Sequence, residues 1–122
     1  MFNQPGYLTA KRMMDATALR HEAIASNLAN LETPGYKRID LAPAFQSELQ
    51  QAVKSREPQN LTGLRPSLSI DPNAVAANRD GNTVQMETEL AHLAENTMAH
   101  QLETQLVSGS LLKLRLAITG RG

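Results

Sequence analysis

Apolar residues between positions 8 and 31 recur with the period of an α-helix. They form one stripe along the predicted helix, made of Met13, Ala16, Ile24, Leu28 and Leu31. No glycine or proline interrupts this segment, and Pro34 follows it closely in the stretch TPGY. Proline lacks an amide proton and disfavours helical geometry in the residue before it. The pattern therefore predicts one long helix that ends at a sharp turn around residue 35.

A second helical pattern extends from about residue 84 to residue 118. Ten positions alternate spacings of four and three, as in a heptad repeat, and hold Met86, Leu90, Leu93, Thr97, His100, Thr104, Val107, Leu111, Leu114 and Ile118. Seven of the ten are apolar, and the polar ones lie in the middle. There, Met98, Leu102 and Leu106 form a neighbouring apolar stripe. This drift of the apolar face predicts a helix that touches more than one neighbour.

The section between the two long helices is polar and contains several prolines and glycines. Its early part, LAPAFQSELQQAVKS, predicts a short helix with Phe45, Leu49, Ala52 and Val53 on one face. Residues 56–83 are predicted to be loop, with LRPSLSI as one extended strand and RDGN forming a turn. The predicted fold is all-α, with a coiled coil of two long helices and a largely irregular middle. Its three sections are a helix with the TPGY turn in 1–35, a short helix with an extended loop in 36–83, and a helix in 84–122.

The charge balance and the missing cysteines exclude several classes of function. The 12 basic and 12 acidic residues cancel, so nothing favours binding to nucleic acid or to an anionic membrane. The basic pairs Lys11–Arg12 and Lys37–Arg38 are interpreted as solvated. Without cysteine there is no disulfide, thiolate metal site or cysteine nucleophile. No stretch approaches the ~18 apolar residues of a membrane-spanning helix. The first residues also lack the apolar core of a cleaved signal peptide.

Aromatic residues are scarce, with two phenylalanines, two tyrosines and no tryptophan. Aromatic side chains supply much of the buried area in small cores, and short chains bury little surface on their own. We therefore expect the isolated chain to be loosely packed. Two interpretations stay open. The chain is either a self-contained helical hairpin, or it buries its helices against copies or relatives of itself.

The one motif with metal-ligand spacing is Glu89-Leu-Ala-His92, the E-x-x-H pattern of di-iron helix bundles. Such a site needs a second E-x-x-H and further glutamates on facing helices, which the sequence does not supply. We interpret Glu89 and His92 as a solvated pair. No nucleophile with an adjacent base and no glycine-rich phosphate loop is present. The sequence predicts no enzymatic activity, metal, cofactor or small-molecule substrate.

The stretch SNLANLETPGYK, residues 26–37, resembles a signature of the bacterial flagellar rod, hook and related axial proteins, A-N-x-A-N-x-x-T-P-G-Y-K. The matching residues are Asn27, Ala29, Asn30, Thr33, Pro34, Gly35, Tyr36 and Lys37. The short length, the stretch DGNTVQMETEL and the ending LKLRLAITG are similar to the basal-body rod proteins, most of all the proximal type. The resemblance covers residues 8–57 and 79–120. His100 departs from it, because an aromatic residue is expected there.

The resemblance implies a structural subunit of the flagellar basal-body rod, in the periplasm, that assembles helically, transmits torque and lines the export channel. It implies partners that include copies of the chain, other axial proteins, the basal-body ring and the export gate. It also implies export through the flagellar type III apparatus without a cleaved signal. An alternative is an export adaptor or chaperone that uses the same helices to cover a client.

Assembly residues follow from the signature and from the two apolar stripes. In the first helix and its turn they are Ile24, Asn27, Leu28, Asn30, Leu31, Thr33, Pro34, Gly35 and Tyr36. In the last helix they are Leu90, Leu93, Val107, Leu111, Leu114 and Ile118. We expect the leucines and isoleucine of the first helix to face those of the last. The amides of Asn27 and Asn30 are expected to bind nearby backbone or a neighbouring subunit.

Overall fold

The computed structural model describes residues 5–76 and 79–119, apart from the side chains of Pro5 and Leu114. In chain order, its elements are α1 (Pro5–Ala29), β1 (Ile39–Leu41), α2 (Ala44–Ser55), α3 (Pro58–Thr62), β2 (Leu68–Ile70) and α4 (Met86–Thr119). The two strands form an antiparallel pair in which Ile39 lies opposite Ile70.

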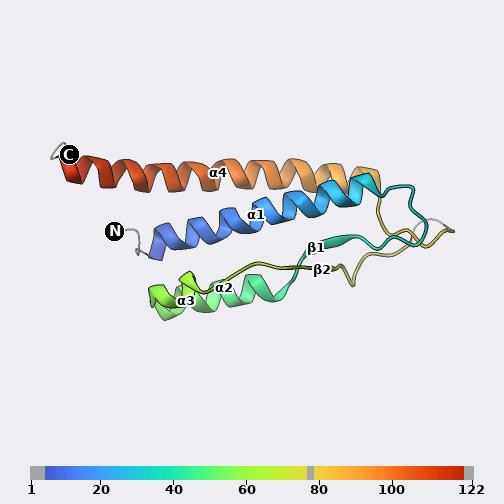
Figure 1. The fold of residues 1–122 in the computed structure, drawn as a ribbon, viewed down its shortest axis with the longest axis horizontal. Coiled ribbons are helices and arrows are strands. Elements are labelled where there is room, and N and C mark those ends of the chain that lie inside the picture. The colour runs from blue at the N-terminus through green and yellow to red at the C-terminus, as the bar shows by residue number, and fades with distance from the viewer. Residues whose placement is uncertain (1–4, 77–78, 120–122) are drawn as a thin grey trace.

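Helix α1 lies between two layers (Figure 1). On one side is α4, which runs antiparallel to α1, since Asn27 meets Glu89 while Thr17 meets Glu103. On the other side are α2, α3 and the strand pair. Helix α4 has 34 residues against 25 in α1, so its last turns extend past the start of α1. The nine extra residues correspond to about 13 Å of helix.

The apolar core lies between α1 and the layer of α2 and α3. Its buried members are Leu8, Ala16, Phe45, Ala52, Leu61 and Leu64. Leu61, in the short helix α3, is completely buried. Phe45 and Ala52 come from the face of α2 that the sequence pattern predicts, whereas Val53 of that predicted face is 39% exposed. This small core anchors the middle section against α1.

The structure confirms the two long helices and the short helix in the middle, but the chain is not all-α. Strands β1 and β2 form a small sheet, and α3 and β2 occupy part of the predicted loop 56–83. Strand β2 lies within the predicted extended stretch LRPSLSI. The sequence pattern does not reveal β1, because a three-residue strand depends on a partner far away in sequence. The packing of the long helices as a coiled coil stays a prediction. Residues 120–122 of the predicted last section lie outside the described residues.

Leu61→Ala should lower the free energy of unfolding by about 2–5 kcal/mol, because it removes a completely buried side chain and leaves a cavity. Ile70→Ala is a suitable control, since Ile70 is 62% exposed and its loss should change stability by only about 0.5 kcal/mol. Urea unfolding followed by circular dichroism measures both. Equal losses in the two variants would contradict the placement of the core.

Candidate functional site

The signature stretch folds into a junction that ties the end of α1 to the start of β1 and α4. Asn27 is completely buried at its centre. Its side-chain amide donates to the carbonyl of Ile39 at 2.9 Å and to a carboxylate oxygen of Glu89 at 3.2 Å. Its carbonyl oxygen accepts from the Ile39 amide at 2.9 Å and from the Tyr36 hydroxyl at 3.2 Å. One side chain thus joins three segments of the chain.

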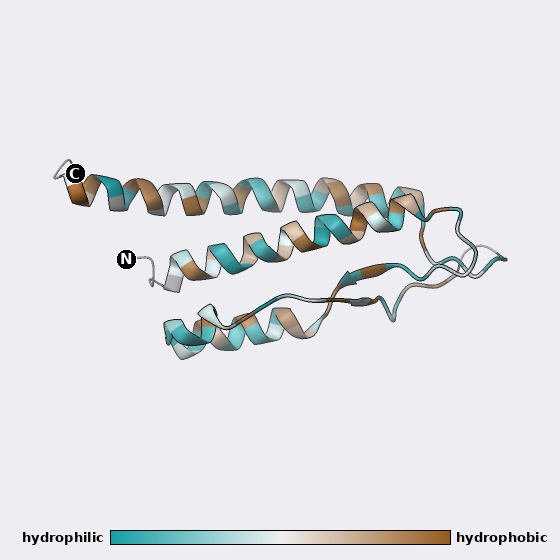
Figure 2. Ribbon diagram, in the orientation of Figure 1, coloured by the Kyte–Doolittle hydropathy of each residue, from teal (hydrophilic) through white to brown (hydrophobic). Residues whose placement is uncertain are grey.

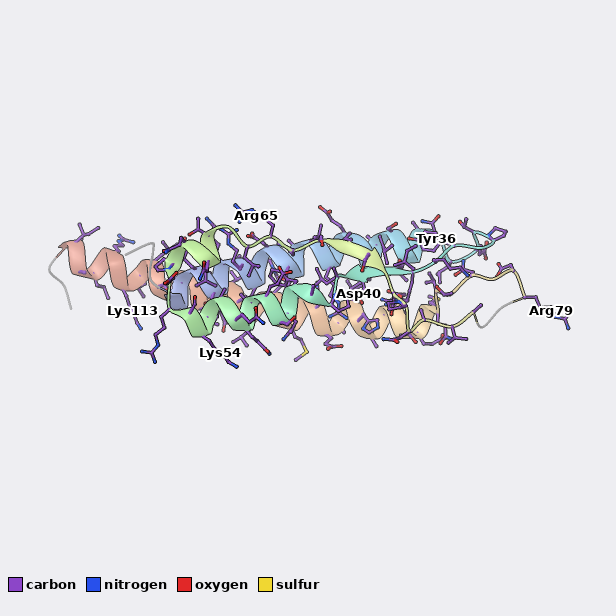
Figure 3. All side chains as sticks on the ribbon, turned by 90° about the horizontal axis from the view of Figure 1, so that it is seen from below. Tyr36, Asp40, Lys54, Arg65, Arg79 and Lys113 are labelled. Carbon is purple, nitrogen blue, oxygen red and sulfur yellow. The ribbon has the colours of Figure 1, made fainter. Side chains whose placement is uncertain are left out.

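The TPGY turn is held by hydrogen bonds from the end of α1. The Thr33 hydroxyl donates to the Asn30 side-chain oxygen at 3.0 Å, and the Asn30 side chain donates to the Ser26 carbonyl at 2.8 Å. Gly35 has φ of +74°, which strongly favours glycine, and its amide donates to the Asp80 carbonyl at 2.8 Å. Tyr36 lies at this loop end of the molecule (Figure 3). These hydrogen bonds and the conformation of Gly35 therefore fix the sharp turn after α1.

Asn82 caps the end of α1, a role that the sequence pattern does not reveal. Its side-chain nitrogen lies 2.8 Å from the Asn30 carbonyl, 3.1 Å from that of Leu31 and 2.8 Å from that of Thr33. Its side-chain oxygen accepts from the Val84 amide at 2.7 Å. These three carbonyls belong to the turn that follows Ala29, the last residue of α1. The RDGN turn signals a bend here, but only the fold brings residue 82 to the end of α1.

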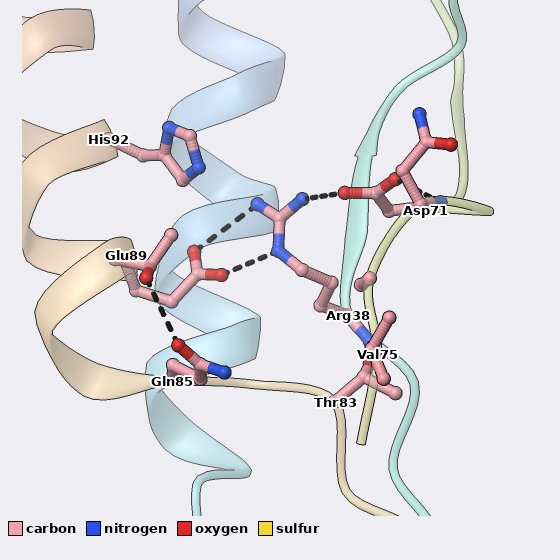
Figure 4. Close-up of a pocket in the computed structure, with 10 residues that line it drawn as sticks. Arg38, Asp71, Val75, Thr83, Gln85, Glu89 and His92 are labelled. Atoms are coloured by element: carbon pink, nitrogen blue, oxygen red, sulfur yellow. Dashed lines mark hydrogen bonds and ion pairs between the residues drawn. The ribbon is translucent and has the colours of Figure 1, made fainter. Parts of the chain in front are cut away.

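A buried ion cluster lies beside this junction, centred on Arg38 (Figure 4). Its Nε donates to Glu89 at 2.6 Å, and its two terminal nitrogens donate to Asp71 at 2.5 Å and to Asp40 at 3.2 Å. Burial favours a lower pKa for Arg38, but the hydrogen bonds to Glu89 and Asp71 outweigh it, and the pKa is raised. The backbone amide of Asn73 holds the pKa of Asp71 below its usual value despite partial burial.

These observations correct two interpretations of charged residues. Arg38, assigned to a solvated basic pair, is 5% exposed, and Arg12 of the other pair is 6% exposed. Glu89, assigned to a solvated pair with His92, is completely buried and bound to Arg38. His92 instead lies 3.0 Å from a guanidinium nitrogen of Arg20. Two acid partners of Arg38, Glu89 and Asp71, are remote in sequence, which is why local charge patterns miss them.

The contact between α1 and α4 is polar along its middle. Three residues seven apart on α4, Glu89, Asn96 and Glu103, are buried on the side that meets α1. The Asn96 side chain donates to the Thr17 carbonyl at 2.8 Å. The Thr17 hydroxyl donates to Glu103 at 2.9 Å and lies 2.9 Å from His100 Nδ1. Burial raises the pKa of Glu103, although the Thr17 hydrogen bond and nearby His100 act in the opposite direction.

The opposite side of α4 is apolar and exposed. We call this side the ridge, and its large members are Met98 (71% exposed), Leu102 (59%), Leu106 (51%), Leu112 (54%) and Leu116 (37%). At 100° per residue, Met98, Leu112 and Leu116 lie on the face turned away from the buried Asn96 and Glu103, while Leu102 and Leu106 lie on the flank between the two faces. Figure 2 shows apolar residues along α4, including the part that extends past α1. The helix therefore buries polar groups and exposes apolar ones.

The predicted assembly residues divide between these regions. Ile24 is buried, Leu28, Leu31, Leu93 and Val107 are half-buried, and the turn residues Thr33, Pro34 and Gly35 are exposed. Leu90, Leu111 and Ile118 are 44%, 42% and 76% exposed, so the expected apolar seam against α1 is wrong at these positions. Polar residues make that contact instead. The side chain of Leu114 lies outside the described part of the chain.

Residues 8–37, which form most of α1 and its turn, match the family described as flagella basal body rod proteins. The chain is 30% identical over 113 residues to the flagellar basal body rod protein FlgB of Aquifex aeolicus, covering 91% of this chain and 90% of the relative. It is 34% identical over 111 residues to FlgB of Cereibacter sphaeroides, covering 83% and 84%. FlgB of Borrelia hermsii is 28% identical over 127 residues, covering 89% and 92%.

The chain belongs to the FlgB family of flagellar basal body rod proteins. It is a structural subunit of the basal-body rod and not an enzyme, as the sequence predicts. The match to residues 8–37 ends at the junction described above, so the shared stretch includes Asn27, Asn30 and the TPGY turn. In this FlgB family member, the hydrogen bonds of those residues fix the direction in which the chain leaves α1.

Arg38→Met should lower the free energy of unfolding by about 3 kcal/mol or more, because it leaves the buried Glu89 without its cation. Arg38→Met combined with Glu89→Leu should recover much of this loss, since both ends of the pair become apolar. Chemical denaturation of the three proteins measures the effect. A double variant as unstable as the single one would contradict the importance of the pair.

Glu103→Gln should change how stability depends on pH. Because the pKa of Glu103 is raised in the folded state, the folded chain binds this proton more tightly than the unfolded chain. The resulting stabilisation is complete below the ordinary pKa of 4.5 and is lost as pH rises through the folded pKa. The stability of the wild type relative to the variant should therefore fall as pH rises from 4.5. Urea unfolding at a series of pH values tests this, and a constant difference would contradict it.

Proposed function

We propose that this rod subunit assembles helically with copies of itself and with other axial proteins, and that the ridge on α4 is its main assembly surface. The observation that carries the proposal is the exposure of Met98, Leu102, Leu106, Leu112 and Leu116 on one side of a long helix. Contiguous apolar surface of this kind marks an interaction site in a soluble protein. Because the chain belongs to a family of rod subunits, the proposed partner of the ridge is another protein.

The polar contact between α1 and α4 supports this division of roles. Asn96 and Glu103 hold α4 on α1 through hydrogen bonds. The apolar area of α4 is thereby left for neighbours instead of being used inside the subunit. Leu90, Leu111 and Ile118 are also largely exposed, but Leu111 and Ile118 lie nearer the side of α4 that bears Asn96 and Glu103 than to the ridge. They remain proposed assembly residues, together with Leu93, Val107 and Leu114.

The junction has a proposed second role in assembly. The buried Asn27, the half-buried Asn30 and their partners set the angle at which the chain leaves α1, and Ile24, Leu28 and Leu31 keep α1 against its neighbours. Thr33, Pro34 and Gly35 form an exposed tip, beside the half-buried Tyr36, that a neighbouring subunit could touch. A fixed exit angle is what repeated contacts need, because each copy must present the same surface to the next.

The assembled rod is proposed to lie in the periplasm, to transmit torque and to line the export channel. Contacts with the basal-body ring and the export gate, and export without a cleaved signal, belong to the same proposal. Family membership supports these points. In residues 5–76 and 79–119, no helix is long and apolar enough to cross a membrane. The alternative, an export adaptor, receives no support from the relatives, whose names describe rod proteins.

Met98→Asp should abolish rod incorporation while leaving the free chain folded. Met98 is 71% exposed in the subunit, so the charge costs little there. Buried in an assembly contact, it would cost about 3 kcal/mol, roughly a hundredfold in an association constant. The measurements are helicity of the purified chain, and motility and rod formation in cells that carry only the variant.

Gln101→Asp is the matched control, since Gln101 is exposed and lies about 60° around the helix from Met98, beside the groove between α1 and α4. It should leave rod formation close to the wild-type level. Rod formation by Met98→Asp at the wild-type level would contradict the ridge as an assembly surface.

A further inference from the structure

Strand β2 has a strand partner along only one of its two edges. In the described part of the chain, the sheet consists of β1 and β2 alone (Figure 1). At the end of the pair, the Asp71 amide donates to the Arg38 carbonyl at 3.0 Å, so the backbone groups of Asp71 point toward β1. Positions that point inward and outward alternate along an antiparallel ladder. The amides and carbonyls of Leu68 and Ile70 therefore point away from β1.

The outer edge of β1 is covered, whereas that of β2 is bare. On β1, the amide and the carbonyl of Ile39 both bind the side chain of Asn27, at 2.9 Å each. On β2, the amides and carbonyls of Leu68 and Ile70 have no hydrogen-bond partner among the residues that the structure describes. Ile70 is also 62% exposed. Unpaired backbone groups in a row are a template for pairing with another strand.

Two prolines define the length of this bare edge. Pro66 lies two residues before Leu68, and Pro72 lies two residues after Ile70. These are the next positions at which backbone groups of an extended chain face the same way. Proline has no amide proton to donate. Leu68 and Ile70 therefore carry the only outward amides that a strand could use between the prolines.

We propose that this edge binds β2 of a second copy of the chain, so that two copies form one four-stranded antiparallel sheet. Both copies offer the same edge, and identical edges face each other only when the two strands run antiparallel about a two-fold axis. With Ser69 at that axis, Leu68 of one copy lies opposite the partner's Ile70. All outward amides and carbonyls of both residues are then paired. A shift by two residues would set one of them opposite a proline and leave a carbonyl in each copy unpaired.

The side chains also match in this register. Leu68 and Ile70 are two residues apart and share one face of β2, so an apolar side chain meets an apolar one on each side of the two-fold axis. On the other face, Ser69 meets its own counterpart, and Asp71 lies opposite the partner's Ser67. No two like charges are opposed across the contact, which would be destabilising.

This contact closes on itself. Each copy uses its one bare strand edge, and the Asn27 side chain covers the outer edge of each β1. The sheet therefore ends at four strands, and the pair cannot extend as a filament. The contact is separate from the ridge on α4 and does not rest on the function proposed for the ridge. The pair belongs to free subunits, in which it shields the bare edge from other chains.

Disulfide cross-linking of the purified full chain tests the register, because the chain has no cysteine of its own. Ser69→Cys should form a linked dimer, since residues directly opposite in an antiparallel pair have Cβ atoms about 4.5–5.5 Å apart. Ser67→Cys is the matched control. Ser67 is more exposed than Ser69, but its two copies would be about 13 Å apart along the strands. After identical oxidation, the dimer yield should be severalfold higher for Ser69→Cys.

Ile70→Pro, added to Ser69→Cys, should reduce the dimer yield to that of Ser67→Cys. The substitution removes an amide that points away from β1, and proline is tolerated at such positions of an edge strand. Circular dichroism of the variant checks that the chain keeps its helices. Ile70→Ala, which retains the amide, should reduce the yield less.

Equal yields from Ser69→Cys and Ser67→Cys would overturn the proposal. An undiminished yield in the presence of Ile70→Pro, in a chain that keeps its helicity, would overturn it too. Met98→Asp should leave the yield from Ser69→Cys unchanged, because the ridge takes no part in this contact. A yield that falls with Met98→Asp would place the contact on the ridge and contradict pairing through β2.

Discussion

The buried ion pair between Arg38 and Glu89 is the constraint on which the arrangement of this subunit depends. Arg38 follows the turn after α1 and Glu89 lies in the first turn of α4, yet the two meet at 2.6 Å. Removing both charges from water is costly unless each is paired and hydrogen-bonded. Asp71, Asp40 and Asn27 complete the set of partners. An arrangement that separates α1, the strand pair and α4 would leave buried charge without a partner.

Helix α4 is built with its polar side inward and its apolar side outward. This reverses the usual order for a helix on the surface of a globular domain. In the subunit, Asn96 and Glu103 give a contact with α1 whose register depends on hydrogen-bond geometry. Hydrogen bonds of this kind contribute about 1 kcal/mol each, less than burial of a large apolar side chain. The apolar area left over is available to other rod subunits, which ties the modest core of the chain to its structural role.

The turn after α1 shows how a short sequence motif acts through distant residues. Gly35 has positive φ, and the carbonyls of the turn after α1 are bound by Asn82 from the segment before α4. The motif therefore works only with the loop that returns to it. For a repeating structure the benefit is a defined exit angle, because an error in angle would be repeated at every subunit contact.

Local pattern determined the elements with strong periodicity. The spacing of apolar residues, together with Pro34 and Gly35, predicted both long helices and the sharp stop between them, and the signature stretch indicated the rod family. Tertiary structure decided what the pattern left ambiguous. The three-residue strands, the cap by Asn82 and the burial of Arg38 and Glu89 all depend on partners tens of residues away. Periodicity along α4 identified two apolar stripes, but only the fold showed that the polar side faces α1. A single sequence reports which side chains share a face. The partners that the fold supplies, such as Arg38 for Glu89 and Thr17 for Glu103, decide whether a polar face can turn inward.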